Sequence, residues 1–423
     1  MGAELDRAGR PVVVVTGLGM VTSLGQGVAE NWRRLTAGQS GIHQVTRFPL
    51  AGLRTKIAGT VDFVALDDPS SAALAEAMAG LVIDEAIEAA GIGRAGAFPG
   101  PLFLALAPVE MEWRERRAVA TASGADPVGY ADLLRTASAG DFTGTYRRFL
   151  FGSVAETLAE RFGTVGSPIA TSTACASGAT AIQLGLEAIR RGETGAALCV
   201  GTDASVNLET LIRFSLLSAL STRNDVPEAA ARPFSKDRDG FVMAEGAAAL
   251  VLESLAHARA RGAKILGVLE GSGEMADSFH RTRSSPDGKP IIACMQGAIA
   301  DAGLSPDDIG YINAHGTGTP ENDKMEWLGV SAVFGERAAS LPMSSNKSMI
   351  GHTLSAAGAI EAAFTVLTLR HGLLPPTINY DTPDPALPVD CVPNRARSAP
   401  VAHALSNSFG FGGQNVSLVF GAV

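Results

Sequence analysis

The amino-acid sequence predicts an α/β fold made of two related halves. Short apolar segments alternate with longer, alanine-rich, helix-like segments along most of the 423 residues, and this alternation is typical of α/β proteins. Two segments repeat one pattern, a strand of small residues leading into an alanine-rich helix: TSTACASGATAIQLGLEAIRRG (171–192) and MSSNKSMIGHTLSAAGAIEAAFTVLTLRHG (343–372). We therefore expect an internal repeat, with one half over 1–263 and the other over 264–423.

The first half begins with the apolar run VVVVTGLG (12–19), which predicts a buried strand that ends in a glycine turn. The next glycine, Gly25, comes too late for G-x-G-x-x-G, so a dinucleotide site is not expected. Helices are predicted over 27–37 and 71–91, and residues 94–150 show only weak periodicity. A strand over 167–173, a helix over 176–191 that Gly192 closes, and a strand over 196–203 follow. Another strand is predicted within 231–253.

The second half repeats the alternation. Helices are predicted over 290–302, from about 321, and over 354–371, with strands over 309–313 and 341–345 between them. Pro375 and Pro376 then break the pattern. The closing segment, ALSNSFGFGGQNVSLVF (404–420), predicts a strand, a glycine turn and a second strand.

Composition and charge exclude several classes of function. The formal net charge of −9 disfavours a nucleic-acid partner. No run approaches the roughly 18 apolar residues that a membrane span needs, and the first ten residues do not resemble a secretory signal. The four cysteines (Cys175, Cys199, Cys294 and Cys391) fit no zinc spacing. We expect a reduced, cytoplasmic setting without disulfides and without a metal.

Cys175 lies among Ser, Thr, Ala and Gly, between a predicted strand and a predicted helix. Unpaired N–H groups at a helix N-terminus favour a thiolate, so this position would lower the thiol pKa and activate a nucleophile. Small neighbours would allow the sharp turn that projects a nucleophile, as in α/β-hydrolases. Taken alone, the residue could equally be a buried cysteine that acts as a small hydrophobic group.

Two of the seven histidines stand out because each follows a predicted strand, where open α/β sheets build their sites. His315 lies in NAHGTGTPEND, where Thr317 and Thr319 add hydroxyls. His352 lies five residues after Lys347, just before a helix. A structural histidine is as good an explanation for either one alone. A Cys–His hydrolase would need only one histidine, so two with a lysine indicate another chemistry.

Four blocks carry a resemblance to a known family: TACASG, NAHGTGTP, NKSMIGHTLSAAGAIE and NSFGFGGQN. In order and spacing they resemble the β-ketoacyl-acyl-carrier-protein synthases of the elongating I/II type. The segments STRNDVPEAAARPFSKDRDGFVMAEGAAALVLE and LPPTINYDTPDP add to the resemblance, which covers 11–65 and 160–423. It implies the thiolase fold: two βαβαβαββ units in a five-layer α/β/α/β/α sandwich. It also implies a homodimer and an acyl carrier protein as partner, with no cofactor.

The resemblance also implies the reaction. Cys175 would accept an acyl chain from a carrier thioester, and malonyl carrier protein would then lose CO2 and attack the acyl-cysteine. His315 and His352 would each donate a ring N–H to the resulting enolate, and Lys347, paired with Glu361, would set the local field.

Two phenylalanines complete the implied site. The N–H groups of Cys175 and Phe411 would form an oxyanion hole. Phe411 would gate the acyl tunnel and Phe409 would support its loop, although core packing would explain both phenylalanines equally well.

The sequence departs from the family in two places. Residues 94–150 match poorly, so no preference for acyl chain length is implied. Ser218 stands where many relatives carry an arginine that helps to dock the acidic carrier. Arg147, Arg148 and Arg213 are candidate replacements, although exposed arginines are more often plain solvated surface. These departures leave open a synthase dedicated to a specialised carrier or to an unusual or long acyl chain.

Other functions are less favoured. Some members of the superfamily are non-catalytic chain-length partners, but here the nucleophile, both histidines and the lysine are all retained. Thiolases use a second cysteine as base, and initiating synthases replace one histidine by asparagine; neither substitution is present. A modular polyketide synthase domain would need flanking domains and is not expected. The pathway stays open among bulk fatty acid, lipid A acyl chains, a cofactor and a polyketide.

Overall fold

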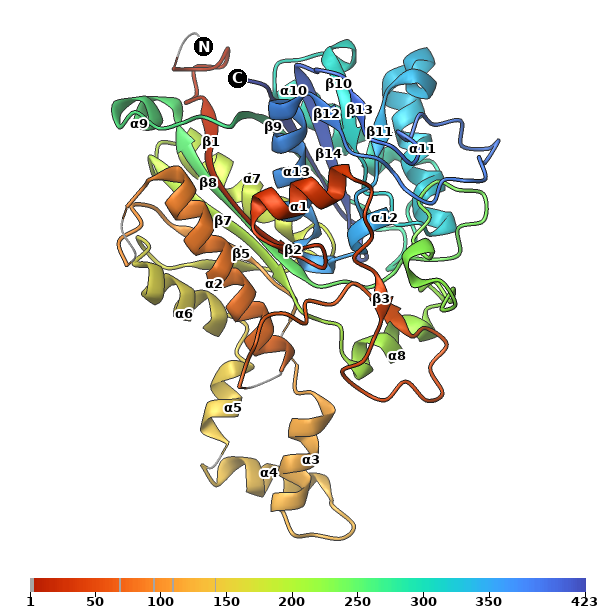
Figure 1. Cartoon of the computed structure of the whole chain (residues 1–423). Helices are drawn as coiled ribbons and strands as arrows, with labels where there is room; N and C mark the ends of the chain where they lie inside the picture. Colours follow the sequence, from red (N-terminus) through yellow and green to blue (C-terminus); the bar gives the residue numbers. More distant parts are fainter. Residues whose placement is uncertain (1–3, 68–69, 94–95, 109, 141) are drawn as a thin grey trace.

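A computed structural model describes residues 4–67, 70–93, 96–108, 110–140 and 142–423 (Figure 1). Residues 1–3, the start of the ten-residue segment that does not resemble a secretory signal, lie outside the described residues. One sheet of eleven strands runs through the molecule in the order β11-β10-β14-β15-β9-β1-β8-β7-β5-β6, with β2 paired to β1. Its strands are β1 (Val13–Thr22), β2 (Gly25–Gln26), β5 (Leu102–Ala105), β6 (Ile169–Thr171), β7 (Ala196–Asp203), β8 (Gly246–Ser254), β9 (Gly267–Ala276), β10 (Ile309–Asn313), β11 (Met343–Ser344), β14 (His403–Phe409) and β15 (Gln414–Gly421).

Apart from β2, the sheet consists of two groups of five strands with the same topology. The first group runs β1-β8-β7-β5-β6 and the second runs β9-β15-β14-β10-β11. In each group the first two pairings are antiparallel and the last two are parallel. The groups join where Val13–Val15 pairs with 267–269. This shared order agrees with an internal repeat, and the boundary between 263 and 264 stays a prediction.

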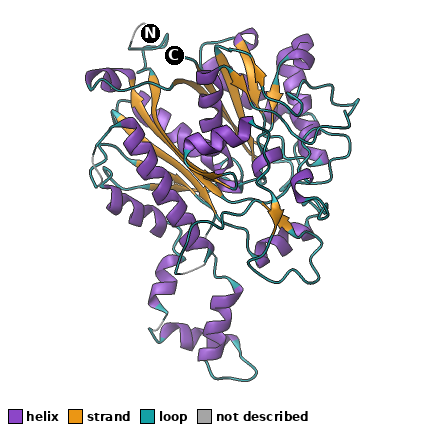
Figure 2. Ribbon diagram, viewed as in Figure 1, coloured by secondary structure: helices purple, strands orange, loops and turns teal. Residues whose placement is uncertain are grey.

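Helices cover and separate the two groups of strands (Figure 2). The first group carries α2 (Ser71–Ala90) and α6 (Ser153–Phe162) on one face, and the second carries α10 (Lys289–Asp301) and α11 (Pro320–Phe334). Between the groups lie α7 (Ser177–Arg190) and α13 (Ala357–His371), which share one hydrophobic core with β1, β7, β8 and β15. The result is a five-layer α/β/α/β/α arrangement.

The two central helices approach each other so closely that their contact requires glycine. A Cβ atom added at Gly178 would lie 2.4 Å from the backbone nitrogen of Ala359, and one at Gly358 would lie 2.5 Å from that of Ala179. The small-residue pattern seen in both repeated segments therefore serves helix packing. Because Cys175 precedes α7 and His352 precedes α13, this contact also brings the two residues together.

The remaining elements decorate this frame. Figure 1 shows α3, α4 and α5 projecting away from the sheet. The helices are α1 (Val28–Thr36), α3 (Trp113–Ala122), α4 (Tyr130–Ser138), α5 (Thr143–Arg148), α8 (Leu208–Leu216), α9 (Leu255–Ala260) and α12 (Lys347–Ile350), and the 3-10 turns are η1 (Pro227–Ala229), η2 (Pro306–Asp308), η3 (Gly335–Ser340) and η4 (Leu354–Ala356). Two small sheets pair β3 (His43–Gln44) with β4 (Ile57–Ala58) and β12 (Leu373–Leu374) with β13 (Arg397–Ser398).

The structure differs from the sequence expectations in a few elements. The strand expected over 341–345 is only the two residues of β11, and the helix expected from 354 begins with the 3-10 turn η4. Within 94–150, where periodicity is weak, the described residues form β5 and the helices α3–α5; α4 and α5 bury no residue completely. No helix in the described part of the chain is both long enough and apolar enough to cross a bilayer.

Candidate active site

Cys175 lies in a sharp turn between β6 and α7. Ala174 has a φ of 49°, the left-handed region that residues with a Cβ rarely adopt. Ser177 stabilises the turn, since its hydroxyl donates to the Ala174 carbonyl at 2.6 Å and accepts from the Thr173 N–H at 2.8 Å. The turn presents the sulfur toward the second half of the chain. Cys175 is only 7% exposed.

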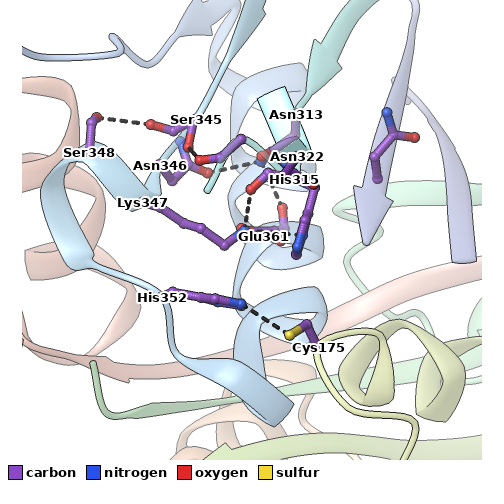
Figure 3. A network of polar contacts seen from close by, with 12 residues as sticks. Cys175, Asn313, His315, Asn322, Ser345, Asn346, Lys347, Ser348, His352 and Glu361 are labelled. Atoms are coloured by element: carbon purple, nitrogen blue, oxygen red, sulfur yellow. Dashed lines mark hydrogen bonds and ion pairs between the residues drawn. The ribbon is translucent and has the colours of Figure 1, made fainter. Parts of the chain in front are cut away.

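The Cys175 sulfur contacts groups from distant parts of the sequence. His352 Nε2 lies 3.1 Å from Sγ (Figure 3), and the backbone N–H of Phe411 also donates to the sulfur. Burial raises the pKa of the thiol to about 11, against the lowering effects of the Phe411 N–H and the Lys347 charge. The net shift is therefore opposite to the expected lowering, because removing the sulfur from water disfavours the thiolate more strongly than its neighbours favour it.

His315 and His352 lie edge to face, with ring centroids 5.4 Å apart. Burial lowers the pKa of each ring well below its usual value, and the nearby positive charge of Lys347 lowers it further. Both rings are therefore neutral near pH 7, so each has one N–H donor and one free lone pair. His352 Nδ1 is buried without a hydrogen-bond partner among the described residues.

The backbone on each side of His352 is fixed by β-type contacts. Its N–H donates to the Val242 carbonyl at 2.7 Å, and its own carbonyl accepts from the Ala244 N–H at 2.9 Å. The ring edge of Phe241 packs against the imidazole, with centroids 5.3 Å apart. The segment FVMAEG (241–246) thus positions one of the two candidate histidines.

Lys347 and Glu361 form the ion pair that the sequence predicts, and it is buried: the side chains are 2% and 1% exposed. Lys347 Nζ also donates to the His315 carbonyl at 2.6 Å and lies 3.4 Å from His315 Nδ1. Burial raises the pKa of Glu361 to about 7, and the Lys347 charge opposes this shift. The pair joins α12, α13 and the loop after β10, as Figure 3 shows.

Glu326, on α11, is a residue that the sequence analysis missed. Its carboxyl accepts from the His315 N–H at 2.8 Å and the Gly316 N–H at 2.7 Å, and Asn407 Nδ2 donates to it at 3.2 Å. Burial raises its pKa to about 7. An acidic residue in the otherwise apolar stretch MEWLGV (325–330) was the available signal, because a glutamate on a buried helix face needs partners.

Asp203, at the end of β7, is a second missed residue. It is buried and accepts from the Ser355 N–H at 3.0 Å, so it ties β7 to the turn η4 that follows His352. Its position as the last residue of the predicted strand AALCVGTD (196–203) was the sequence signal.

Two cavities meet at Cys175. The larger, of about 490 Å³, is lined among others by His315, His352, Thr317 and Thr319. The smaller, of about 350 Å³, extends past α8 toward the start of α2. Phe214, Leu354 and Phe411 line both, and the rings of Phe214 and Phe411 lie 6.5 Å apart. The buried sulfur can thus be reached from two directions.

The other predicted site residues line one of the two cavities, except for two arginines on α5. Phe409 packs against His315, with ring centroids 5.8 Å apart, and the hydroxyls of Thr317 and Thr319 are 2.9 Å apart. Ser218 lines the larger cavity, whereas Arg213 lines the smaller one in an ion pair with Glu110. Arg147 and Arg148 lie on α5 and line neither cavity. His280, which has no distinctive sequence context, lines the larger cavity.

The sulfur and the two imidazoles also form a possible metal-ligand set. One ligand atom from each of Cys175, His315 and His352 lies within 4.8 Å of the others. A cysteine and two histidines are ligands that Zn²⁺ accepts. A thiol beside two neutral imidazoles equally suits nucleophilic attack on a thioester followed by stabilisation of an oxyanion.

Comparisons with known proteins place these features in a family. Residues 10–258 match the family "Beta-ketoacyl synthase, N-terminal domain", and residues 266–381 match "Beta-ketoacyl synthase, C-terminal domain". A Coxiella burnetii protein named "3-oxoacyl-[acyl-carrier-protein] synthase 2" is 36% identical over 97% of this chain and 98% of its own length. The tetracenomycin polyketide synthase ketoacyl synthase alpha subunit of Streptomyces glaucescens is also 36% identical, over 95% of each chain.

Solved structures agree with the sequence comparisons. One similar structure contains a type II PKS acyl-carrier protein in complex with its ketosynthase bound to the hexaketide. A chain of that structure matches with a TM-score of 0.87 at 33% identity, over 98% of this chain and 100% of its own length. A beta-ketoacyl synthase from Burkholderia phymatum matches with a TM-score of 0.86 at 32% identity, over 97% and 99%. The thiolase fold implied by the sequence is thereby confirmed, and the chain belongs to the beta-ketoacyl synthase family.

Proposed function

We propose that this chain catalyses the decarboxylative condensation of a malonyl-loaded acyl carrier protein with an acyl group held on Cys175, giving a 3-oxoacyl carrier protein. One observation carries the proposal. A buried thiol lies 3.1 Å from a neutral imidazole, beside a second neutral imidazole, where two cavities meet. One cavity suits the carrier-borne thioester and the other suits the acyl chain.

Acyl transfer begins with loss of the thiol proton. Because the thiol is neutral in the resting site, His352 Nε2 takes its proton as the sulfur attacks the thioester carbonyl. The backbone N–H groups of Cys175 and Phe411 receive the negative charge on the carbonyl oxygen. The bond to the carrier sulfur breaks, that sulfur leaves with the proton, and the acyl chain remains on Cys175.

Condensation uses both imidazoles as hydrogen-bond donors. When malonyl carrier protein loses CO2, negative charge develops on its thioester oxygen, and N–H groups of His315 and His352 stabilise it. The enolate carbon then attacks the acyl carbonyl, a C–C bond forms and the C–S bond breaks, and the departing Cys175 thiolate takes up a proton from solvent to restore the thiol. Lys347 holds His315 through its carbonyl and opposes protonation of both rings, which keeps them neutral.

The larger cavity suits an anionic carrier. Its lining includes three cationic side chains, from Arg281, Arg283 and Lys324, against two carboxylates, from Asp277 and Glu321. The phosphate of a carrier prosthetic group and the acidic carrier itself would favour that entrance. The carrier-bound ketosynthase among the similar structures supports the same partner.

The proposal includes a homodimer that works in the cytoplasm. Large apolar side chains on α3 and α4 and just beyond α5 are exposed in the single chain, among them Trp113, Tyr130, Leu134 and Leu150. A second copy would cover such a surface. Condensation in a polyketide pathway is a second candidate, which the similarity to ketosynthases of that class favours.

Intact-mass spectrometry tests the proposal. The purified chain is mixed with acyl carrier proteins loaded with graded acyl groups, with Cys175→Ala as the matched control. An acyl adduct on the wild-type chain alone, together with malonyl decarboxylation, is the expected result. If neither an adduct nor decarboxylation occurs with any acyl group, the chain is not a condensing enzyme.

A further inference from the structure

The smaller cavity changes character along its length. Around the sulfur its walls are apolar, from Phe214, Leu354 and Phe411. Farther along, residues 106–108 and 110–112, which follow β5, and the first turn of α2 close around it, and the lining becomes ionic. Four charged residues line this end: Glu110, Glu112, Glu209 and Arg213.

Glu110 and Arg213 lie at the outer end. Their carboxylate and guanidinium are 2.5 Å apart, and the side chains are 49% and 50% exposed in the single chain, whereas Cys175 is 7% exposed. Arg213 and Glu110 line the same cavity as Cys175 and Phe214. An acyl chain on Cys175 that fills the length of this cavity would therefore meet the pair.

The outer wall is held in place by carboxylates. Besides the Glu110–Arg213 pair, Glu112 accepts from the Ser71 N–H at 2.6 Å, and Glu209 accepts from the Trp113 N–H. These contacts tie the loop that carries Glu110 to both α2 and α8. The ion pair therefore has a fixed place rather than lying on a free loop.

We propose that the Glu110–Arg213 pair makes this chain select acyl groups with a neutral, oxygen-bearing distal end over saturated chains long enough to reach the pair. A methyl end would displace water from both charges and offer no hydrogen bond in return. A hydroxyl would donate to Glu110 and accept from Arg213. An anionic end is disfavoured, because three carboxylates stand against one guanidinium at this end of the cavity.

This inference rests on the proposed function, since it assigns the smaller cavity to the acyl chain. Pantetheine thioesters test it without any carrier protein. The acyl series runs from butanoyl to hexadecanoyl, each saturated chain beside its ω-hydroxy form. Acylation of Cys175 is followed by intact mass. For wild type we expect the acylation rate to fall once a saturated chain is long enough to reach the Glu110–Arg213 pair. An ω-hydroxyl on a chain of that length should raise the rate roughly tenfold.

Two variants separate the ion pair from general effects of mutation. In E110L/R213L the rate for long saturated chains, divided by that for butanoyl, should rise roughly tenfold, and the ω-hydroxy preference should vanish. E110Q/R213Q, which removes charge with less change in shape, serves if the first variant unfolds. The matched control E187L/R191L removes an exposed ion pair at the C-terminal end of α7, outside both cavities, and should keep the wild-type profile.

The outcomes are distinct for the two proposals. Equal wild-type rates for saturated and ω-hydroxy chains at every length overturn the inference, as does a wild-type profile in both cavity variants. Absence of any Cys175 adduct, from butanoyl pantetheine and from butanoyl carrier protein alike, refutes the proposed function instead.

Discussion

Replacing Lys347 with methionine should destabilise the chain by about 3–5 kcal/mol, because the change leaves the Glu361 carboxylate buried without its counter-charge. Both side chains are almost fully buried, at 2% and 1% exposed, so solvent screening gives no reason to reduce that range. The lost donor to the His315 carbonyl adds to the effect. The reverse change, Glu361→Met, buries an unpaired ammonium and should cost a similar amount.

The double variant K347M/E361M distinguishes a coupled pair from two independent contacts. With both charges gone, no group is left buried and unpaired, so the loss should fall short of the sum of the single losses by about 2 kcal/mol or more. Urea denaturation followed by circular dichroism gives each free energy of unfolding. A double loss equal to the sum would refute the buried-pair reasoning.

The pH dependence gives an independent check on K347M. Without Lys347, only raising effects on the pKa of Glu361 remain, from burial and then from the Glu326 charge, so the folded carboxyl binds its proton more tightly than the unfolded one. Stability is then greatest below the unfolded pKa of about 4.5 and declines as the pH rises through the folded value. The destabilisation by K347M should therefore be larger near pH 8 than near pH 5. As a control, neutralising the exposed Glu187–Arg191 pair should change stability by about 0.5 kcal/mol or less.

Three further predictions address the site and the core. The rate of Cys175 alkylation by iodoacetamide should rise about tenfold per pH unit from about pH 7 to pH 10, because only the thiolate reacts and burial raises the pKa of the thiol to about 11. A plateau near pH 8 would mean that the helix end sets the thiol pKa instead of burial. His315→Ala should slow malonyl decarboxylation by about 10²–10³-fold while Cys175 is still acylated, and equal losses in both steps would contradict its role as an enolate donor. Gly178→Ala should lower the free energy of unfolding by about 1–3 kcal/mol in urea denaturation, since the added Cβ would lie 2.4 Å from the Ala359 nitrogen. An unchanged urea midpoint would mean that the two central helices can move apart at no cost.

Much of the fold could be predicted from local patterns. Apolar runs, glycine turns and alanine-rich helices are properties of neighbouring residues, so β1, β7, α2 and α7 lie close to their expected bounds. The repeated small-residue segments likewise predicted two strand–helix units. Weak periodicity in 94–150 gave no such guide, because α4 and α5 have few buried residues to produce a pattern.

The chemistry of the candidate site was predictable only in part. Cys175, His315 and His352 could be singled out because each follows a predicted strand and lies among small residues. The acidic residue in an apolar stretch was the only sequence signal for Glu326, and it did not show the role of this side chain, because only the folded chain brings the two backbone N–H groups to it.

By itself the sequence determined the order of strands and helices, the turn that holds Cys175, and the blocks that identify the family. Tertiary structure decided what the sequence could not. It brings His352 to the Cys175 sulfur across 177 positions of the chain, buries the thiol so that its pKa rises, and pairs Glu110 with Arg213 across 103 positions. The physical reason is that burial and charge pairing depend on contacts between segments far apart in the chain, whereas strand and helix patterns depend on neighbours.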